Sequence, residues 1–287
     1  MASGDFSKES TFDHWCHLVT CVFDAYCRCG NSFFQRTTDF DSSSWHSSRH
    51  RRRRAFEYLN IFMDKFVYII ALIPFCAVWI IIFIKRKDLR QEMLVMSLLI
   101  GILSVVTSYY WWTVDWWRPI TMTGTRVGIE DFIMGFTTGG LMATLYEVVF
   151  KRALYKRKLH HHISGGLTIL FLLAQTTMWL FWGMSLTSFW ASAIAMILVA
   201  VIMIFVRKDL LLNSLLSGVL MVFVSTLFYG TVLLISPEWI HQTYLSGLSG
   251  LNIFGIPIEE FIFWFMAGVV FGPFYEYWQG EKLKAVK

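Results

Sequence analysis

The sequence lacks the short motifs that mark the commonest cofactor and nucleophile sites. It contains no P-loop, no H-E-x-x-H, no G-x-S-x-G and no G-x-G-x-x-G after a strand. Those motifs hold phosphates, zinc, a serine nucleophile and dinucleotides. We therefore expect neither a bound cofactor nor a metal. The last apolar stretch also has no lysine near its middle, which argues against a retinal Schiff-base protein.

Charged residues are scarce as well. They form 16% of the 287 residues, whereas 56% are hydrophobic and the mean hydropathy is +0.53, as is typical of a multi-pass membrane protein. The net charge is +5, but the basic residues form short clusters between apolar runs. This pattern fits loops beside a membrane and argues against a nucleic-acid partner.

Residues 1–62 differ in character from the rest of the chain. They are rich in Ser, Cys, His and Arg, and contain the run RHRRRR at residues 49–54. We expect a disordered tail, or sequence upstream of a natural start at Met63. The alternatives are a basic anchor or a metal site, although C-x4-C-x5-C-x-C fits no usual zinc pattern. The residues of that metal site would be Cys16, His17, Cys21, Cys27 and Cys29.

Seven apolar runs follow, each close to the ~20 residues that span a bilayer. The fold class predicted is therefore all-α and transmembrane. Pro74 and Pro273 fall inside runs, where kinks are tolerated. The predicted spans are 66–84, 93–112, 131–150, 165–184, 189–206, 211–235 and 258–278.

Basic clusters predict the orientation. They follow the first, third, fifth and seventh spans, so they share one face, which the positive-inside rule makes cytoplasmic. We expect a cell-membrane protein with its N-terminus outside and its C-terminus in the cytoplasm. The cluster residues are Lys85, Arg86, Lys87, Lys151, Arg152, Lys156, Arg157, Lys158, Arg207, Lys208, Lys282, Lys284 and Lys287.

Two helix starts are acidic and resemble each other. Residues 129–147 read IEDFIMGFTTGGLMATLYE and residues 258–276 read IEEFIFWFMAGVVFGPFYE, with 8 of 19 positions identical. Carboxylates at the mouth of a transmembrane helix are costly and usually functional. We therefore expect the functional site to lie between the two copies.

The duplication extends beyond these helices. RKDL at 86–89 recurs at 207–210, and SLLIG at 97–101 recurs as SLLSG at 214–218, with spacing that differs by four residues. We predict two parallel three-helix repeats, residues 63–158 and 187–287, joined by an extra fourth helix within residues 159–186. Parallel repeats place both acidic pairs at one membrane face.

Each acidic pair has two interpretations. Carboxylates held close together repel as anions, which favours one protonated and one ionised group that can deliver and remove protons. Alternatively, acids at a helix N-terminus are N-caps that stabilise by ~1 kcal/mol. Two pairs at matching positions favour catalysis, and the candidate catalytic residues are Glu130, Asp131, Glu259 and Glu260.

Other repeated features have plainer explanations. Gly139 and Gly268 each lie eight residues past an acid, which predicts close helix packing. Tyr146–Glu147 and Tyr275–Glu276 lie ~25 Å further along their helices, at the other membrane face, and indicate interfacial anchors. His160–His162 indicates a surface loop.

The segment at residues 109–120, YYWWTVDWWRPI, is predicted to be a loop after the second span. It is either an aromatic belt at the membrane surface or a wall of π faces that stabilises a cation beside the acids. Asp115–Trp116 corresponds to Glu238–Trp239 in the second half.

Together these residues resemble a known family. Pro257, Glu259 and Glu260 match the P-x-E-[E/D] signature of membrane-integral lycopene cyclases. The resemblance is to the two-subunit actinobacterial type in fused form, as in archaeal enzymes and the cyclase domain of fungal bifunctional enzymes. It covers residues 63–287, and no phytoene-synthase domain is present.

The first copy departs from the signature at one position. Glu130 and Asp131 match it, but Gly128 stands where the second copy has Pro257. The resemblance implies substrate contacts by Pro257 and by nearby aromatic residues. These are Phe132, Phe261, Trp116 and Trp264.

The resemblance implies a non-redox reaction of isomerase or intramolecular-lyase type. A carboxylic acid protonates the terminal double bond of a linear carotene, the C5=C6 bond attacks the cation, and a carboxylate removes a proton to leave an ionone ring. The expected partners are the lipid-soluble carotene and membrane lipid, with a homo-oligomer or other carotenoid enzymes as further candidates. The alternatives are an end-group hydratase and a seven-helix transporter or binding protein.

Overall fold

The computed structural model describes residues 64–155, 163–245, 249–280 and 282–285. The extension at residues 1–62, its cysteines and arginines, and His160–His162 lie outside the described residues. Within the described ranges, seven helices are long and apolar enough to cross a membrane. They are Asp64–Lys85, Lys87–Asp115, Ile129–Val149, Gly165–Gly183, Ser188–Val206, Lys208–Ile235 and Ile258–Gln279.

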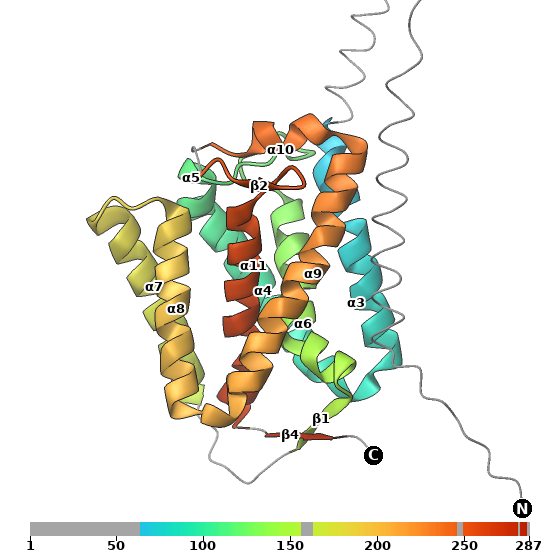
Figure 1. Ribbon diagram of the computed structural model, residues 1–287, viewed down its shortest axis with the longest axis vertical. Coiled ribbons are helices and arrows are strands. Elements are labelled where there is room, and N and C mark those ends of the chain that lie inside the picture. Colours follow the sequence, from blue (N-terminus) through green and yellow to red (C-terminus); the bar gives the residue numbers. More distant parts are fainter. Residues whose placement is uncertain (1–63, 156–162, 246–248, 281, 286–287) are drawn as a thin grey trace, which may run out of the picture. The chain divides into compact units, whose positions relative to one another are not determined.

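These helices confirm all seven predicted spans, with differences of a few residues at their ends. The protein is an all-α, multi-pass membrane protein (Figure 1). Residues 64–71 are helical and lead into the first labelled helix. The elements are α3 (Ile73–Lys85), η1 (Lys87–Leu89), α4 (Arg90–Thr107), η2 (Ser108–Trp112), α5 (Thr113–Asp115), α6 (Ile129–Val149), β1 (Arg152–Tyr155), α7 (Ile163–Met178), η3 (Trp179–Gly183), α8 (Ser188–Val206), η4 (Lys208–Leu210), α9 (Leu211–Ile235), α10 (Pro237–Thr243), β2 (Asn252–Ile253), β3 (Ile256–Pro257), α11 (Ile258–Phe271), α12 (Phe274–Gln279) and β4 (Lys282–Ala285).

Three local features differ from the simplest expectation. The predicted loop at residues 109–120 begins later, because α4 continues as the π-helical turn η2 and then α5 before it ends at Asp115. The last span breaks at Pro273 into α11 and α12, since proline cannot continue the backbone hydrogen bonding. Two small antiparallel sheets, β1–β4 and β2–β3, accompany the helices.

Close helix contacts depend on glycine, as predicted. A Cβ atom on Gly139 of α6 would lie 2.6 Å from the Met96 carbonyl oxygen of α4. A Cβ atom on Gly268 of α11 would lie 2.6 Å from the Ser217 carbonyl oxygen of α9. Each pair of helices therefore packs backbone against backbone. Helix α6 is the most buried of the seven spans.

The two membrane ends of the bundle differ. At one end α6 and α11 begin, beside α5, α10 and the β2–β3 hairpin (Figure 1). We call it the acid-pair end, after Glu130, Asp131, Glu259 and Glu260. At the other end lies the β1–β4 sheet.

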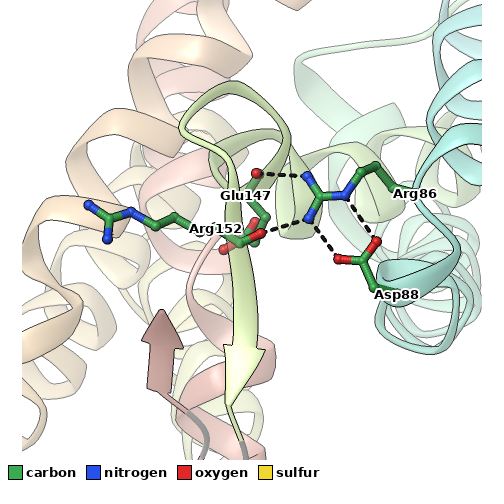
Figure 2. Close-up of polar contacts among 4 residues, drawn as sticks. All are labelled: Arg86, Asp88, Glu147 and Arg152. Carbon is green, nitrogen blue, oxygen red and sulfur yellow. Dashed lines mark hydrogen bonds and ion pairs between the residues drawn. The ribbon is translucent and has the colours of Figure 1, made fainter. Parts of the chain in front are cut away.

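We call this second end the arginine end, after Arg86 and Arg207. The Arg86 guanidinium donates hydrogen bonds to the carbonyl oxygens of Glu147 (2.9 Å) and Arg152 (2.6 Å), and it pairs with Asp88 (Figure 2). It thereby joins the start of the second span to the end of α6 and to β1. A guanidinium is also favourable beside the unpaired carbonyls of a helix C-terminus.

Candidate active site

Four buried carboxyls occupy the first turns of α6 and α11. Glu130 and Asp131 follow the N-cap residue Gly128. Glu259 and Glu260 follow the N-cap residue Pro257, whose ring suits a helix start. The four acids are between 0% and 3% exposed, which is rare for carboxyls unless they are paired or functional.

The first acid of each pair faces a loop. The backbone N–H of Met122 donates to Oε1 of Glu130 at 2.6 Å, and the backbone N–H of Ser249 donates to Oε1 of Glu259 at 2.6 Å. Both loops precede the helix that carries the acid. Glu130 and Glu259 therefore hold matching loops over the acid-pair end.

The second acid of each pair faces a common cavity. Asp131 and Glu260 both line it, whereas Glu130 and Glu259 do not. The cavity lies among α4, α6, α7, α8, α9 and α11. Since α6 belongs to one half of the chain and α11 to the other, the site is formed jointly by both halves.

A hydroxyl on the preceding helix contacts each of these acids. Ser108 donates to Oδ1 of Asp131 at 3.2 Å, and Tyr229 donates to Oε2 of Glu260. Ser108 and Tyr229 are 121 residues apart, the same separation as Arg86 and Arg207. The helix contacts of Gly139 and Gly268 keep this offset, since Met96 and Ser217 are also 121 apart. These contacts follow the 121-residue offset of RKDL, whereas SLLIG and SLLSG lie 117 residues apart in the sequence.

Further aromatic groups complete the polar end of the cavity. The Tyr68 hydroxyl donates to Oδ1 of Asp131 at 3.4 Å. The Trp264 indole N–H donates to the Tyr229 hydroxyl at 3.4 Å. Burial and, secondly, the nearby carboxyl of Glu260 raise the pKa of Tyr244 well above its usual value. The Tyr244 hydroxyl therefore stays protonated beside that acid.

Aromatic rings form the wall beside the acids. Trp116 and Phe263 meet edge to face with ring centroids 5.1 Å apart, and Trp112 and Phe263 do so at 5.4 Å. All three line the cavity, as does Trp264. Ring faces stabilise a cation held near them. Of the two interpretations of the tryptophan-rich segment, the geometry favours a wall beside the acids, although Tyr109 and Tyr110 are exposed.

The remaining lining is apolar and extends away from the acids. Met142 of α6 and Phe271 of α11 both line the cavity. Each lies eleven residues past its acid, which corresponds to ~16 Å along a helix. Val106 also lines the cavity and is 41% exposed. The cavity wall thus includes part of the lipid-facing surface.

The residues predicted to contact a substrate divide into two groups. Trp116 and Trp264 line the cavity. Pro257 does not, but it sets the start of α11. Phe132 and Phe261 are partly buried and lie outside the lining; the Phe132 ring packs against Gly101 of α4.

Sequence reasoning missed Ser108, Tyr68, Tyr229 and Phe263. Ser108 and Tyr229 could have been found from the sequence. The two RKDL motifs are 121 residues apart, and the same separation pairs Ser108 with Tyr229. Tyr68 and Phe263 had no such signal. Among the described residues, no group of three or more His, Cys, Asp or Glu side chains is arranged to hold a metal ion.

Comparison with known proteins agrees with these residues. A family model described as Lycopene cyclase matches residues 62–149 and 187–278, which are more than half of the chain and contain both acidic pairs. The chain therefore belongs to the lycopene cyclase family. No curated protein and no solved structure matches it.

Proposed function

We propose that this carotenoid cyclase closes ionone rings at the ends of a linear carotene, with Asp131 and Glu260 as its two catalytic carboxyls. One observation carries the proposal: the second acid of each pair, one from each half, lines the same apolar, aromatic-walled cavity. Glu130 and Glu259 are positioning residues, because their hydrogen bonds go to the loops.

The cavity lining supports a proton-initiated cyclisation. A carboxyl protonates the terminal double bond, the aromatic rings stabilise the tertiary cation, and a carboxylate removes a proton after ring closure. The substrate is apolar, so the cavity beyond the acids needs no polar contact with the rest of the polyene. An apolar wall also keeps water from the cation, which favours cyclisation over end-group hydration.

Two features of organisation belong to the same proposal. The matched contacts around Arg86 and Arg207, and around Asp131 and Glu260, support two parallel repeats. The basic residues at the arginine end, among them Lys85, Lys151 and Lys208, support a cytoplasmic location for that end. The acid-pair end then faces outward.

The test is pigment analysis of lycopene-producing cells that express the chain from Met63. We expect cyclic carotenes from the wild type. Substitution of either cavity acid, Asp131→Asn or Glu260→Gln, should lower ring formation by ~10²-fold or more, the usual contribution of a positioned proton donor or acceptor.

The matched control is Glu238→Gln. Glu238 is an exposed acid near the same membrane end, on α10, and its loss should leave the pigment unchanged. Linear carotene alone from the wild type, with the protein present in the membrane, would refute the cyclase proposal. Hydroxylated linear carotenes would identify a hydratase, and unaltered pigment with solute flux would identify a transporter.

A further inference from the structure

The two cavity acids differ in how many hydrogen bonds they accept. Asp131 accepts three: from the Gly128 backbone N–H at 2.8 Å, from Ser108 at 3.2 Å and from Tyr68 at 3.4 Å. Donors that point at a carboxyl stabilise its anionic form. These three donors favour the carboxylate form of Asp131, which is the form that removes a proton.

Glu260 accepts fewer hydrogen bonds of regular geometry, although the Tyr244 hydroxyl and the Trp264 indole N–H also lie near its carboxyl. Tyr229 donates to its Oε2, and because Tyr229 itself accepts from Trp264, its own proton is directed at the acid. Oε1 of Glu260 accepts no regular hydrogen bond from the residues that the structure describes, although Tyr244 lies near this carboxyl. Oε2 of Glu260 is thus fixed by a hydrogen bond, and Oε1 is available to carry a proton into the cavity.

The N-cap residues explain part of this difference. Gly128 has a backbone N–H and uses it to close a capping box with Asp131. Pro257 occupies the same position before Glu260, and proline has no N–H to donate. The single departure from the signature in the first half, Gly in place of Pro, therefore supplies a donor that the second half lacks.

We infer that the two halves divide the chemistry: Glu260 protonates the carotene end, Asp131 removes the proton, and Asp131 thereby decides which ring forms. The inference rests on the proposed function. Pro257 and Tyr229 act as positioning residues, Pro257 by withholding a hydrogen bond and Tyr229 by fixing Oε2.

The proton balance is as follows. The proton on Oε1 of Glu260 goes to C2 of the terminal C1=C2 bond and leaves a cation at C1. The C5=C6 π electrons form the C1–C6 bond and move the charge to C5. Asp131 then takes a proton from C6, which gives a β ring, or from C4, which gives an ε ring. Water at the acid-pair end carries a proton from Asp131 and returns one to Glu260.

The experiment compares two variants that keep the carboxyl but move it by one methylene, Asp131→Glu and Glu260→Asp. Membranes that contain each variant receive lycopene, and chromatography separates β and ε end groups. Asp131→Glu should shift the ratio of ring types, because it moves the group that selects the proton. Glu260→Asp should lower the rate and leave the ratio as in the wild type.

Pro257→Ala restores the backbone N–H that proline lacks and removes no existing hydrogen bond. Its new N–H should cap Glu260 and lower the ring-forming rate several-fold, with the ratio of ring types unchanged. Pro237→Ala, at the first helical residue of α10, should change neither. Rates are expressed per folded protein, so a poorly folded variant is not counted as inactive.

The outcomes separate the two proposals. A wild type that forms no rings refutes the cyclase function itself. A wild type that forms rings, with the ratio shifted by Glu260→Asp and not by Asp131→Glu, reverses the roles of the acids. If Asp131→Glu and Glu260→Asp give the same ratio of β to ε ends, the two acids do not have separate roles. An unchanged ring-forming rate in Pro257→Ala would also contradict those roles.

Discussion

The acid-pair end and the arginine end each contain a matched pair of buried carboxyls, with one member from either half of the chain. Asp131 and Glu260 form such a pair at the first end, and Glu147 and Glu276, both 0% exposed, form one at the second. Only the first pair lines the cavity described above. Burial at matching positions therefore does not by itself place an acid at the cavity.

The surroundings distinguish the two ends. At the acid-pair end, Ser108, Tyr68 and Tyr229 donate to the side chains of the acids. At the arginine end, one side-chain amide, that of Asn213, donates to Glu276. The guanidiniums of Arg86 and Arg207 donate instead to the backbone carbonyls of Glu147 and Glu276, at 2.9 and 3.3 Å. The first arrangement fits the proton transfers proposed above, and in the second the arginines connect helix ends.

The largest expected effect is the difference in ring formation between variants of the acids at the two ends. Glu147→Gln and Glu276→Gln should leave ring formation close to that of the wild type, whereas Asp131→Asn and Glu260→Gln lower it by ~10²-fold or more. Glutamine retains the Oε1 that accepts from Asn213 at 2.6 Å, so the fold should tolerate Glu276→Gln. Pigment yield per membrane-inserted protein measures the difference. Loss of ring formation in the Glu147 variant would remove the contrast between the ends.

A second effect separates the ends by stability. Arg86→Ala leaves the carbonyls of Glu147 and Arg152 without this donor and should destabilise the protein by about 2–4 kcal/mol. Thermal unfolding in detergent measures the loss. Arg126→Ala is the control at the acid-pair end, where Arg126 makes an exposed contact with Tyr109, and it should cost less than about 0.5 kcal/mol. A similar loss for both variants would contradict the assigned role of Arg86.

The smallest expected effect compares two serines. Ser108→Ala removes one of the three donors to Asp131 and should slow ring formation about fivefold, since such a bond contributes roughly 1 kcal/mol. Ser217→Ala removes a 2.9 Å hydrogen bond to Asn213 near the arginine end. It should leave the rate unchanged and lower stability by roughly 1 kcal/mol. A slower rate in the Ser217 variant would show that the ends are coupled.

Much of the fold is readable in the sequence because a bilayer imposes simple rules. Runs of apolar residues long enough to cross it become helices, and all seven were predicted. The acids at the starts of α6 and α11 were also predicted, from their duplication and from the signature around Pro257. A carboxylate is energetically unfavourable at the start of a transmembrane helix, so these acids stand out in the sequence.

The direction in which each acid points was not predictable. Glu259 and Glu260 are neighbours in sequence, yet one meets the Ser249 backbone and the other the cavity. That choice depends on the rotation of α11 and on the path of a loop, both set by tertiary packing. Tyr229 was missed because no acid or motif stands beside it in the sequence, and it pairs with Ser108 only when the 121-residue offset of RKDL is extended along both helices.

The exposed edge of the cavity at Val106 has a consequence for kinetics. A polyene that enters through a lipid-facing wall is dissolved in the bilayer and not in water, so its effective concentration is its mole fraction among the lipids. Added lipid dilutes such a substrate even when the amounts of enzyme and carotene are constant. For the proposed cyclase, saturation is therefore expected to depend on how much bilayer the carotene shares.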